Sequence, residues 1–279
     1  MQIAKSYVSL KAKNKILQQQ NAKTAFVPTM GALHEGHFAL IKQAKTIADK
    51  VIVSIFVNPL QFNQQADFAE YPIMIEEDVK ALQDIGVDLA YLPTIEDIYP
   101  AGFDTYVKPG KIVNCLCGTS RGSHMQGVAT ILLKLFNRLQ PDMALFGEKD
   151  YQQFLLTKKM ADDFDLPIKV IPIATEREKT GLAMSSRNKN LSQNAKEKIA
   201  PLIYQKLLQV AQSDIALDIA IKQANEQLII QGFSKIDYFE LRDQENLQLL
   251  NNRVANSRLF IAAWLEGVRL IDNIAIMAD

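Results

Sequence analysis

The stretch FVPTMGALHEGHFAL, residues 26–40, contains two of the three histidines in a chain of 279 residues. It begins with an apolar run, and a helical pattern follows from about Glu35 or Gly36, so it predicts the end of a strand and the first turn of a helix. His34 and His37 then lie on one face of that turn. Because helical side chains lean toward the helix N-terminus, both imidazoles are expected to point back toward the carboxyl end of the strand.

This turn has the features of an anion-binding site. The first turn of a helix presents backbone N–H groups without intrahelical partners and carries the positive end of the helix dipole. Glycines at 31 and 36 allow a ligand to approach the backbone, and imidazole donates hydrogen bonds and can carry charge near neutral pH. The alternative is that one histidine only caps the helix. A zincin-type metal site is rejected, because that pattern needs histidines at i and i+4, whereas HEGH spaces them at i and i+3.

Apolar runs on both sides of this stretch alternate with segments of helical period. The runs cover 24–29, 51–57, 87–93, 143–148 and 168–174, and the helical segments cover 37–50, 75–85, 127–139 and 151–164. Near-continuous apolar strands separated by amphipathic helices indicate a parallel sheet with both faces covered. Residues 1–175 are therefore predicted to form a doubly wound, Rossmann-like α/β domain, whose ligands lie beyond the carboxyl ends of the strands.

The rest of the chain has a different pattern. Two helical stretches, AKEKIAPLIYQKLLQVAQ and LDIAIKQANEQLIIQG, precede strand-like runs at 235–243, 258–265 and 268–276. The dipeptide at 266–267, Glu-Gly, separates the last two runs and predicts a hairpin turn. Residues 176–279 are therefore expected to form a smaller α+β C-terminal domain.

Composition narrows the class of function. The chain has 31 basic and 31 acidic side chains, so it has no overall charge that would attract nucleic acid or an anionic membrane. Its two cysteines, Cys115 and Cys117, suit neither a disulfide framework nor a four-ligand zinc site. No apolar run approaches the roughly 20 residues that span a bilayer, and the first residues lack a signal-peptide pattern. We expect a cytoplasmic protein with no nucleic-acid partner and no membrane partner.

Three other segments are predicted at the same end of the sheet. FGEKDYQQ (146–153) follows a strand and opens a helix, and it offers a lysine that could meet a phosphate. GLAMSSRN (181–188) supplies two hydroxyls and an arginine suited to a polyphosphate, and FVNPLQF (56–62) supplies two amide side chains. Each segment alone has an ordinary explanation, as a helix cap, a polar loop or a turn. Their convergence on one face favours a nucleotide site.

Taken together, PTMGALHEGH, FVNPLQF, FGEKDYQQ and GLAMSSRN resemble the motifs of the pantothenate synthetases, the pantoate–β-alanine ligases. The resemblance extends from residue 24 to the AAWL and RLIDN segments near the C-terminus. The histidine pair and MSSR also resemble the HIGH and KMSKS signatures of the wider nucleotidyltransferase superfamily. Membership of that superfamily would imply a HUP-type Rossmann-like fold.

The resemblance implies an ATP- and Mg²⁺-dependent condensation in two steps. The carboxylate of pantoate attacks the α-phosphorus of ATP, which releases pyrophosphate and leaves pantoyl adenylate on the enzyme. The amine of β-alanine then attacks the acyl carbon and expels AMP. Such chemistry requires fixed donors where negative charge develops on the phosphoryl oxygens. The resemblance also implies a homodimer, and a C-terminal domain that closes as a lid.

The resemblance assigns roles residue by residue. It implies catalysis by His34 and His37, with His37 as the proton donor. Pantoate is assigned to Gln61, Gln153 and Arg121, and β-alanine is assigned to Gln61. ATP is assigned to Met30, Gly31, Ala32, Leu33, His34, Glu35, Gly36, His37, Gly147, Glu148, Lys149, Asp150, Glu176, Met184, Ser185, Ser186 and Arg187.

The sequence contains no obvious carboxylate cage for Mg²⁺, so the ATP phosphates are expected to supply most of its ligands, with Glu77 and Asp78 as side-chain candidates. Two segments depart from the family pattern. YPI carries Ile73 where the family has an arginine, and SRGSHMQG lacks a proline although Arg121 and His124 keep their spacing. These departures concern loop order and affinity for pantoate, and they leave the four core motifs intact.

Two other functions are compatible with parts of this pattern. A nucleotidylyltransferase would share the histidine and serine motifs but would keep its adenylylated product. AMP formation that depends on β-alanine separates the ligase from this transferase. A binding module on the same scaffold would bind ATP without chemistry, and pyrophosphate exchange that depends on pantoate separates the ligase from this module.

Overall fold

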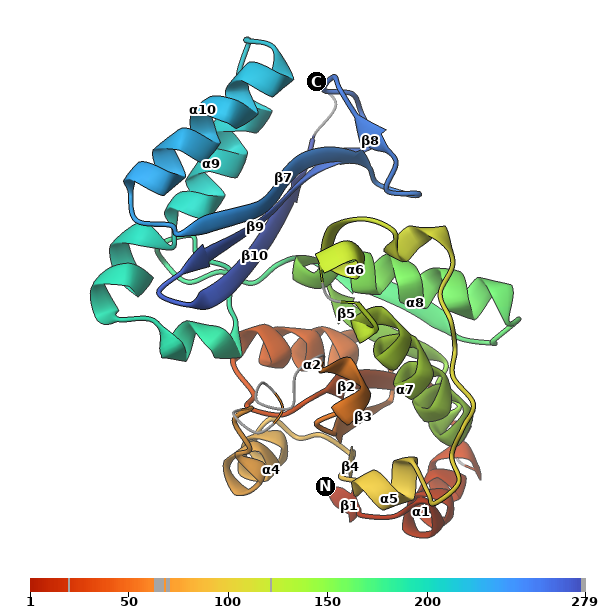
Figure 1. Ribbon diagram of the computed structural model, residues 1–279. Coiled ribbons are helices and arrows are strands. Elements are labelled where there is room, and N and C mark those ends of the chain that lie inside the picture. The colour runs from red at the N-terminus through yellow and green to blue at the C-terminus, as the bar shows by residue number, and fades with distance from the viewer. Residues whose placement is uncertain (20, 63–67, 69–70, 121, 277–279) are drawn as a thin grey trace. The chain divides into compact units, whose positions relative to one another are not determined.

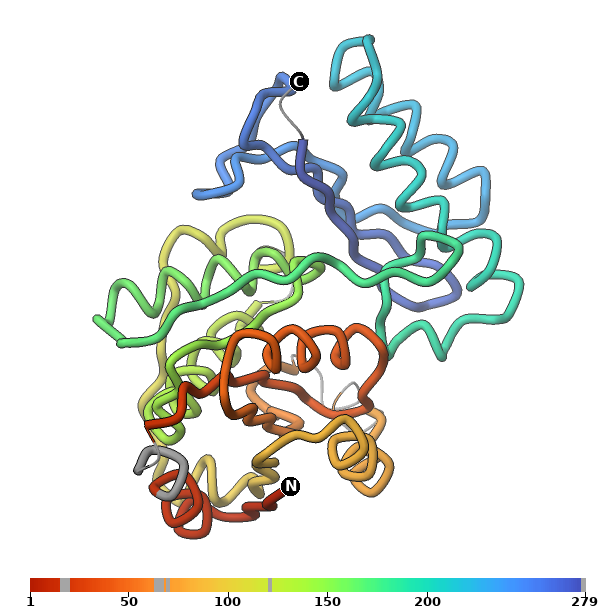
Figure 2. Tube along the Cα trace, turned by 180° about the vertical axis from the view of Figure 1, so that it is seen from behind, coloured from red at the N-terminus to blue at the C-terminus, as the bar shows by residue number. Residues whose placement is uncertain are grey.

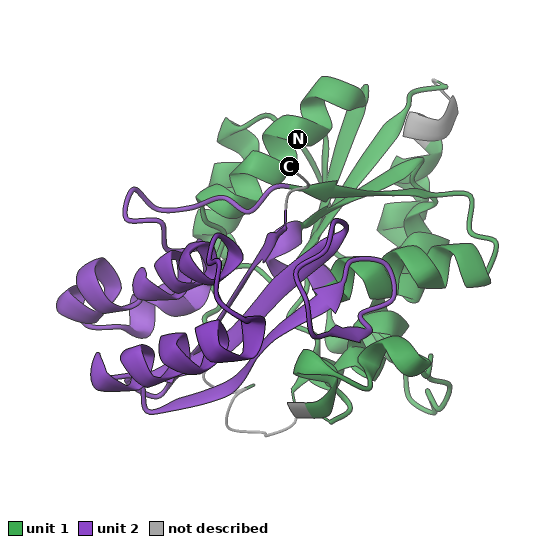
Figure 3. Cartoon of the chain, turned by 90° about the horizontal axis from the view of Figure 1, so that it is seen from above, with its two compact units in different colours: residues 1–147, 152–173 green, residues 148–151, 174–279 purple. Residues whose placement is uncertain are grey.

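The computed structural model describes residues 1–19, 21–62, 68, 71–120 and 122–276 (Figure 1). Contacts divide the chain into two compact units, shown in green and purple in Figure 3. Unit 1 comprises Met1–Gly147 and Gln152–Ile173, and unit 2 comprises Glu148–Tyr151 and Ala174–Asp279. Among the helices of the described residues, none is both long enough and apolar enough to cross a membrane.

Unit 1 is built on six strands. They are β1 (Gln2–Ala4), β2 (Thr24–Thr29), β3 (Lys50–Ile55), β4 (Leu89–Tyr91), β5 (Met143–Gly147) and β6 (Lys169–Ile173). Its helices are α1 (Tyr7–Gln19), α2 (Glu35–Ile47), α4 (Ile75–Asp84), α5 (Ile95–Ile98), α6 (Leu116–Ser120), α7 (His124–Leu139) and, except for its first residue, α8 (Tyr151–Asp163). Two 3₁₀ turns lie at η1 (Pro59–Gln61) and η2 (Lys111–Val113).

The six strands form the predicted parallel sheet, in the order β1-β4-β3-β2-β5-β6. β2 pairs with β3 on one side and with β5 on the other, so the chain order reverses between β2 and β5. In doubly wound sheets, ligands bind outside the carboxyl ends of the strands at such a reversal. The ends of β2 at Thr29 and of β5 at Gly147 therefore mark the edge at which a ligand is expected.

Both faces of this sheet are buried, which explains why its strands are almost continuously apolar. Successive side chains of a strand point to opposite faces. Ala25 and Val27 of β2 join a buried cluster with Ile41 of α2, the helix that follows β2 in Figure 2. Phe26 lies between them in sequence and meets Phe136 of α7, with ring centroids 6.3 Å apart.

Unit 2 is the expected smaller α+β arrangement. Its elements are η3 (Glu148–Asp150), η4 (Ser186–Asn190), η5 (Ala195–Ile199), α9 (Leu202–Ala211), α10 (Leu217–Ile230), β7 (Lys235–Asp243), β8 (Leu249–Leu250), β9 (Ser257–Leu265) and β10 (Val268–Ala275). The strands form an antiparallel sheet in the order β10-β9-β7-β8, and α9 and α10 share one buried cluster with it. The predicted hairpin between β9 and β10 is confirmed, with positive φ at Glu266 and Gly267.

Several observed elements were not predicted, among them the short elements α5, α6 and β8. The first strand and helix, β1 and α1, precede the stretch in which the pattern begins at residue 24. The helical stretch predicted from residue 195 to 212 is divided, because Pro201 has no N–H with which to continue an α-helical ladder. Instead η5 forms one π-helical turn, in which the N–H of Ala200 donates to the carbonyl of Ala195 at 2.8 Å, and α9 follows.

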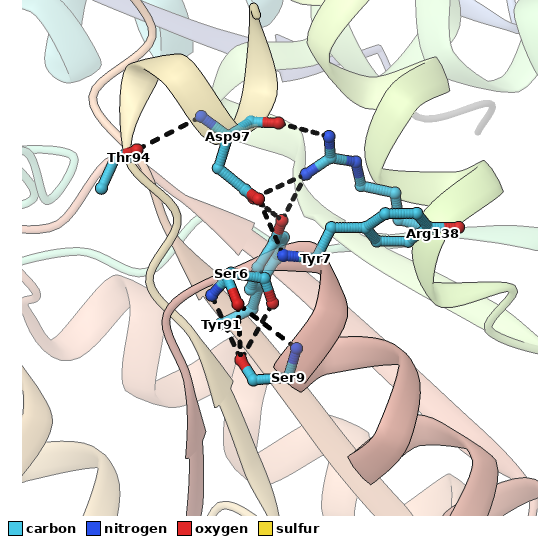
Figure 4. A network of polar contacts seen from close by, with 7 residues as sticks. All are labelled: Ser6, Tyr7, Ser9, Tyr91, Thr94, Asp97 and Arg138. Atoms are coloured by element: carbon cyan, nitrogen blue, oxygen red, sulfur yellow. Dashed lines mark hydrogen bonds and ion pairs between the residues drawn. The ribbon is translucent and has the colours of Figure 1, made fainter.

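A polar network fixes the four-residue helix α5 within unit 1 (Figure 4). Arg138 of α7 donates through Nη1 to Oδ2 of Asp97 at 2.8 Å, and the Tyr91 hydroxyl donates to the same oxygen at 2.6 Å. The backbone N–H of Tyr7, at the start of α1, donates to Oδ1 of Asp97 at 2.8 Å. Asp97 therefore connects α5 to α7, to the end of β4 and to α1.

Candidate active site

The loop between β2 and α2 carries the first candidate residues, and its backbone is unusual. Gly31 has φ of 86° and Ala32 has φ of 50°, so two successive residues occupy the left-handed region. The carboxylate of Asp78 accepts the backbone N–H groups of Ala32 and Leu33, each at 2.8 Å. A Cβ atom at position 31 would lie 3.0 Å from Oδ2 of Asp78. Glycine is therefore favoured at Gly31 both by conformation and by space.

Asp78 thus stabilises the conformation of the loop that leads to the histidines. Only 4% of Asp78 is exposed, and each of its carboxylate oxygens already accepts one backbone N–H. Its neighbour Glu77, the other side chain considered for Mg²⁺, is exposed. Among the residues that the structure describes, no three histidine, cysteine or acidic side chains are grouped so that they could hold a metal ion.

The histidine pair closes the N-terminus of α2, which begins at Glu35 as predicted. His34 is the N-cap residue, and its Nδ1 accepts the backbone N–H of Gly36 at 3.2 Å. Nδ1 of His37 accepts the backbone N–H of His34 at 3.3 Å, which completes a reciprocal capping box. The two ring centroids lie 4.1 Å apart. Both histidines therefore cap this helix.

Capping also fixes the tautomer that each ring adopts when it is neutral. A nitrogen that accepts an N–H group cannot carry its own proton, so a neutral ring held through Nδ1 has its proton on Nε2. His34 and His37 each accept through Nδ1. Each ring therefore has an Nε2–H donor at the far side from the backbone it caps, beside the positive end of the α2 dipole. Helix capping therefore uses Nδ1 of each ring.

In the segment after β3, the side chain of Asn58 is fully buried and makes four hydrogen bonds. Its Oδ1 accepts the Leu60 N–H at 3.3 Å and the Tyr99 hydroxyl at 2.8 Å. Its Nδ2 donates to the Gly127 carbonyl at 3.1 Å and to Oε1 of Gln61 at 2.9 Å. A backbone N–H can only donate and a backbone carbonyl can only accept, so Leu60 and Gly127 together determine which way the Asn58 amide faces.

The orientation of Asn58 determines that of Gln61. Because Nδ2 of Asn58 donates to Oε1 of Gln61, the amide nitrogen Nε2 is the atom that Gln61 can offer to an acceptor on a ligand. Gln61 is 9% exposed. The Tyr99 ring packs against Phe56 and Phe103 at centroid distances of 6.1 and 4.9 Å. Burial raises the pKa of the Tyr99 hydroxyl, so this group stays protonated and remains a donor to Asn58.

In unit 2, three of the residues assigned to ATP line a single pocket. Lys149, Ser185 and Arg187 come together there, although η3 and η4 lie far apart in the sequence. Arg269 and Asp272 of β10 also line the pocket. The hydroxyl oxygen of Ser185 accepts the N–H of Arg187 at 3.3 Å and so caps η4. The pocket lining thus carries two arginines, a lysine and the Asp272 carboxylate, and Nε of Arg269 donates to Oδ2 of Asp237 at 2.7 Å.

The segment that contains Lys149 is held firmly within unit 2. Nδ2 of Asn273 donates to the carbonyls of Glu148 and Lys149, each at 2.9 Å. The Glu148 carboxylate lies 3.3 Å from Nη2 of Arg258, which is 5% exposed. Asp150 is exposed, and its Oδ2 lies 3.8 Å from Nζ of Lys149. Sequence reasoning found this segment but not the β10 residue that anchors it.

Other assigned residues are placed as follows. The N–H of Met184 donates to the carbonyl of Glu176 at 3.0 Å, so these two residues are neighbours. Gln153 lies in the first turn of α8, and its carbonyl accepts the Thr157 hydroxyl at 2.7 Å. Arg121 lies outside the described residues. Sequence reasoning missed the contacts of Asp78 and Tyr99 with the candidate segments, because nothing in the local pattern signals a partner so distant in sequence.

Comparison with known proteins gives one consistent result. The family model described as pantoate-beta-alanine ligase matches residues 2–275. A pantothenate synthetase from Roseobacter denitrificans is 47% identical over 253 residues, which cover 90% of this chain and 89% of the relative. One from Shewanella halifaxensis is 43% identical over 272 residues, which cover 96% of each chain.

The chain belongs to the pantoate-beta-alanine ligase family.

Solved structures agree with this assignment. The crystal structure of pantothenate synthetase from Thermus thermophilus matches with a TM-score of 0.92 and 37% identity, and the match covers 100% of both chains. The Francisella tularensis ligase, solved in complex with beta-gamma ATP and beta-alanine, matches with a TM-score of 0.86 and 39% identity over 100% of this chain and 99% of that one. The resemblance stated from the motifs is confirmed, and the protein is an enzyme of this type.

Proposed function

We propose that this enzyme joins pantoate to β-alanine in two steps through a bound pantoyl adenylate. In the first step a carboxylate oxygen of pantoate bonds to the α-phosphorus of ATP, and the bond from that phosphorus to the pyrophosphate oxygen breaks. In the second step the amine of β-alanine bonds to the acyl carbon and loses a proton, and AMP leaves with the oxygen that linked it to the acyl group. The products are pantothenate, pyrophosphate and AMP.

The histidine pair is the observation that carries this proposal. Two Nε2–H donors beside a helix N-terminus suit a phosphate group whose oxygens gain negative charge during the attack. The pair lies at the end of β2, next to β5, where the strand order reverses. We assign His34 and His37 to the phosphates of ATP, with His37 as the proton donor. Because Nδ1 of each ring is engaged, the hydrogen that His37 donates to a phosphate oxygen is the one on Nε2.

Two amides and one arginine are assigned to the acid substrate. Gln61 offers Nε2–H donors, and a donor suits the hydroxyl and carboxylate oxygens of pantoate. A neutral amide binds a carboxylate without the strong charge pairing that would reduce its nucleophilicity. Gln153 and Arg121 are proposed as the other contacts of pantoate, and Gln61 is also proposed to face β-alanine.

The proposed ATP contacts come from four segments of the chain. They are Met30–His37 after β2, Gly147–Asp150 at the end of β5 and in η3, Glu176, and Met184–Arg187 around the start of η4. Mg²⁺ is proposed to arrive with ATP and to be held mainly by the phosphates, since the described residues hold no cluster of metal-binding side chains. Lys149, Ser185 and Arg187, which line one pocket, would then supply positive charge and a hydroxyl to the nucleotide.

Isotope exchange between pyrophosphate and ATP tests the proposed first step. We expect exchange only when pantoate is present, and AMP release only after β-alanine is added. Exchange without pantoate would contradict the order of steps. A stable adenylate that β-alanine does not consume would instead support the nucleotidylyltransferase, and ATP binding with no exchange under any condition would support a binding module.

The family also suggests where the enzyme is located and how many chains it contains. We propose that the protein is cytoplasmic and forms a homodimer. Sedimentation equilibrium of the purified chain tests the second assignment, with twice the mass of one chain as the expected result. A mass equal to that of one chain at micromolar concentration would contradict it.

A further inference from the structure

His124 is buried beside the residue assigned to the acid substrate. It is the first residue of α7 and 8% exposed, and its Nδ1 lies 2.7 Å from the backbone carbonyl oxygen of Gln61. A carbonyl can only accept, so Nδ1 of His124 carries the proton. His124 therefore holds the opposite tautomer from His34 and His37 when all three rings are neutral.

The first turn of α7 packs directly on the turn that carries Gln61. A Cβ atom at Gly127 would lie 2.1 Å from the carbonyl oxygen of Leu60, a distance that no real side chain can adopt. The carbonyl of Gly127 accepts Nδ2 of Asn58 at 3.1 Å. α7 thus contacts η1 through the backbone of Gly127, which has no side chain, and through the His124 ring.

Gln61 is consequently fixed at two points. His124 holds its main-chain carbonyl, and Asn58 holds its side-chain oxygen at 2.9 Å. The first contact fixes the main chain of the turn, and the second leaves Nε2 as the side-chain group that Gln61 can offer to a ligand. Loss of either contact would allow the amide to rotate or the turn to shift. A misplacement of about 1 Å in a binding group is enough to lower a rate by roughly two orders of magnitude.

We propose that His124 is a positioning residue for the acid substrate, which acts by fixing the main chain of Gln61 through its Nδ1–H. This inference rests on the proposed role of Gln61 in binding pantoate. His124 itself has no assigned contact with substrate. Its effect is therefore expected on the Michaelis constant for pantoate and not on that for ATP.

Three substitutions of His124 separate this role from a general loss of packing. The Nδ2 atom of asparagine and the Nδ1 atom of histidine are both bonded to Cγ, so His124→Asn retains a donor at nearly the same place. His124→Gln places its amide one bond further out, and His124→Ala removes the donor. In pantoate-dependent pyrophosphate exchange, we expect KM for pantoate to rise about tenfold for His124→Ala and His124→Gln, the effect of one buried hydrogen bond. His124→Asn should stay within about threefold of the parent, and KM for ATP should change less than about twofold in all three.

Asn14→Ala provides a matched control at the other end of α7. Nδ2 of Asn14, which is 5% exposed, donates to the carbonyl of Leu139 at 2.6 Å, so this substitution also removes a buried donor to a backbone carbonyl of unit 1. The control is expected to lower the melting temperature by an amount similar to that for His124→Ala. Its KM for pantoate is expected to be unchanged. An increase in KM for pantoate in this control would attribute the His124 effect to loss of stability alone and would overturn the proposal.

A double-substitution cycle tests whether His124 acts through Gln61. In a Gln61→Ala background, His124→Ala is expected to change KM for pantoate less than about twofold. The same tenfold rise in both backgrounds would mean that His124 acts independently of Gln61, and the inference would be wrong. If Gln61→Ala alone left KM for pantoate unchanged, the assignment of Gln61 under the proposed function would fail instead. If Gln61→Ala raised KM but His124→Ala did not, only the inference about His124 would fail.

Discussion

Nδ1 of His37 accepts the backbone N–H of His34 at 3.3 Å, so the residue assigned as proton donor is also part of a helix cap. Two functions therefore depend on one ring, one through Nδ1 and the other through Nε2. A substitution that removes the whole side chain loses both. A substitution that keeps an acceptor at the Nδ1 position separates them.

His37→Ala is expected to lower the rate of adenylate formation by about 10²-fold or more, the usual effect of removing one transition-state donor. It should also destabilise the protein by about 1 kcal/mol, because the cap is lost. His37→Asn is the control, since its side-chain oxygen can accept the His34 N–H but it offers no donor where Nε2 stands. We expect His37→Asn to recover most of the stability and little of the rate, as measured by urea unfolding and pyrophosphate exchange. An unchanged rate in either variant would remove the proposed role of His37.

Gln61→Glu should weaken pantoate binding far more than ATP binding. Asn58 would still donate to one carboxylate oxygen of the new side chain, so the turn is expected to stay folded. The other oxygen would replace Nε2 and would repel the carboxylate of pantoate. We expect KM for pantoate to rise at least about tenfold, and more than for Gln61→Ala, because a donor is replaced by a negative charge. Equal weakening of pantoate and ATP would show that the acid pocket is misassigned.

Asp78→Asn is expected to destabilise unit 1 by about 1–3 kcal/mol, because one of two buried backbone N–H groups would then face an amide N–H₂. The loop of Gly31 and Ala32 would lose part of what holds its left-handed conformation, so the rate of adenylate formation should fall as well. Glu77→Gln is a control on the neighbouring, exposed residue and should change the free energy of unfolding by less than about 0.5 kcal/mol. Equal effects of the two substitutions on urea unfolding would refute the role given to Asp78.

The network around Asp97 predicts a specific dependence of stability on pH. Burial alone would raise the pKa of the Asp97 carboxyl, but hydrogen bonds from Tyr91 and from the Tyr7 N–H, together with Arg138, outweigh it and lower that pKa below 3.8. A carboxyl whose pKa is lowered by folding stabilises the protein above its unfolded pKa, and this contribution is lost as pH falls through the folded pKa.

Asp97→Asn should therefore be less stable than the parent at pH 7. The difference in the free energy of unfolding between the two proteins should shrink as the pH is lowered below 3.8. Urea unfolding at a series of pH values between about 7 and 3 measures it. Asp163→Asn is a suitable control, because Asp163 forms an exposed ion pair with Lys159 at 2.7 Å and should contribute little at any pH. A difference for Asp97→Asn that did not depend on pH would contradict the argument.

The parallel sheet could be predicted from sequence because its strands are buried on both faces and so are nearly continuous in apolar residues. The strand β1 carries no such signal, since it has three residues and lies at the sheet edge. The start of α2 at Glu35 was predictable because capping and helical period agree there. The π-helical turn was not, since AKEKIAPLIYQKLLQVAQ keeps a helical pattern through Pro201 and the backbone adjusts locally around it.

The sequence predicted which residues form the candidate site better than it predicted the contacts that hold them in place. A short motif such as HEGH shows which side chains are present and how they are spaced. It gives no indication that Ala32 adopts a positive φ, because alanine is not a residue type that favours this region. Nor does it indicate that Asp78, which lies in the later helix α4, accepts backbone N–H groups of the loop between β2 and α2. Contacts of this kind depend on the tertiary fold, and no local pattern encodes them.

The tetrapeptide Glu148–Tyr151 belongs to unit 2, although the residues on both sides of it belong to unit 1. A separately expressed fragment Ala174–Asp279 would keep every strand of the antiparallel sheet. It would nevertheless lack the carboxylate that pairs with Arg258, the tyrosine ring on which that guanidinium stacks at 3.9 Å, and the two carbonyls that Asn273 binds. A fragment that contains all of unit 2 therefore needs residues 148–151 joined to it, because no single contiguous stretch of the chain covers unit 2 without also including residues of unit 1.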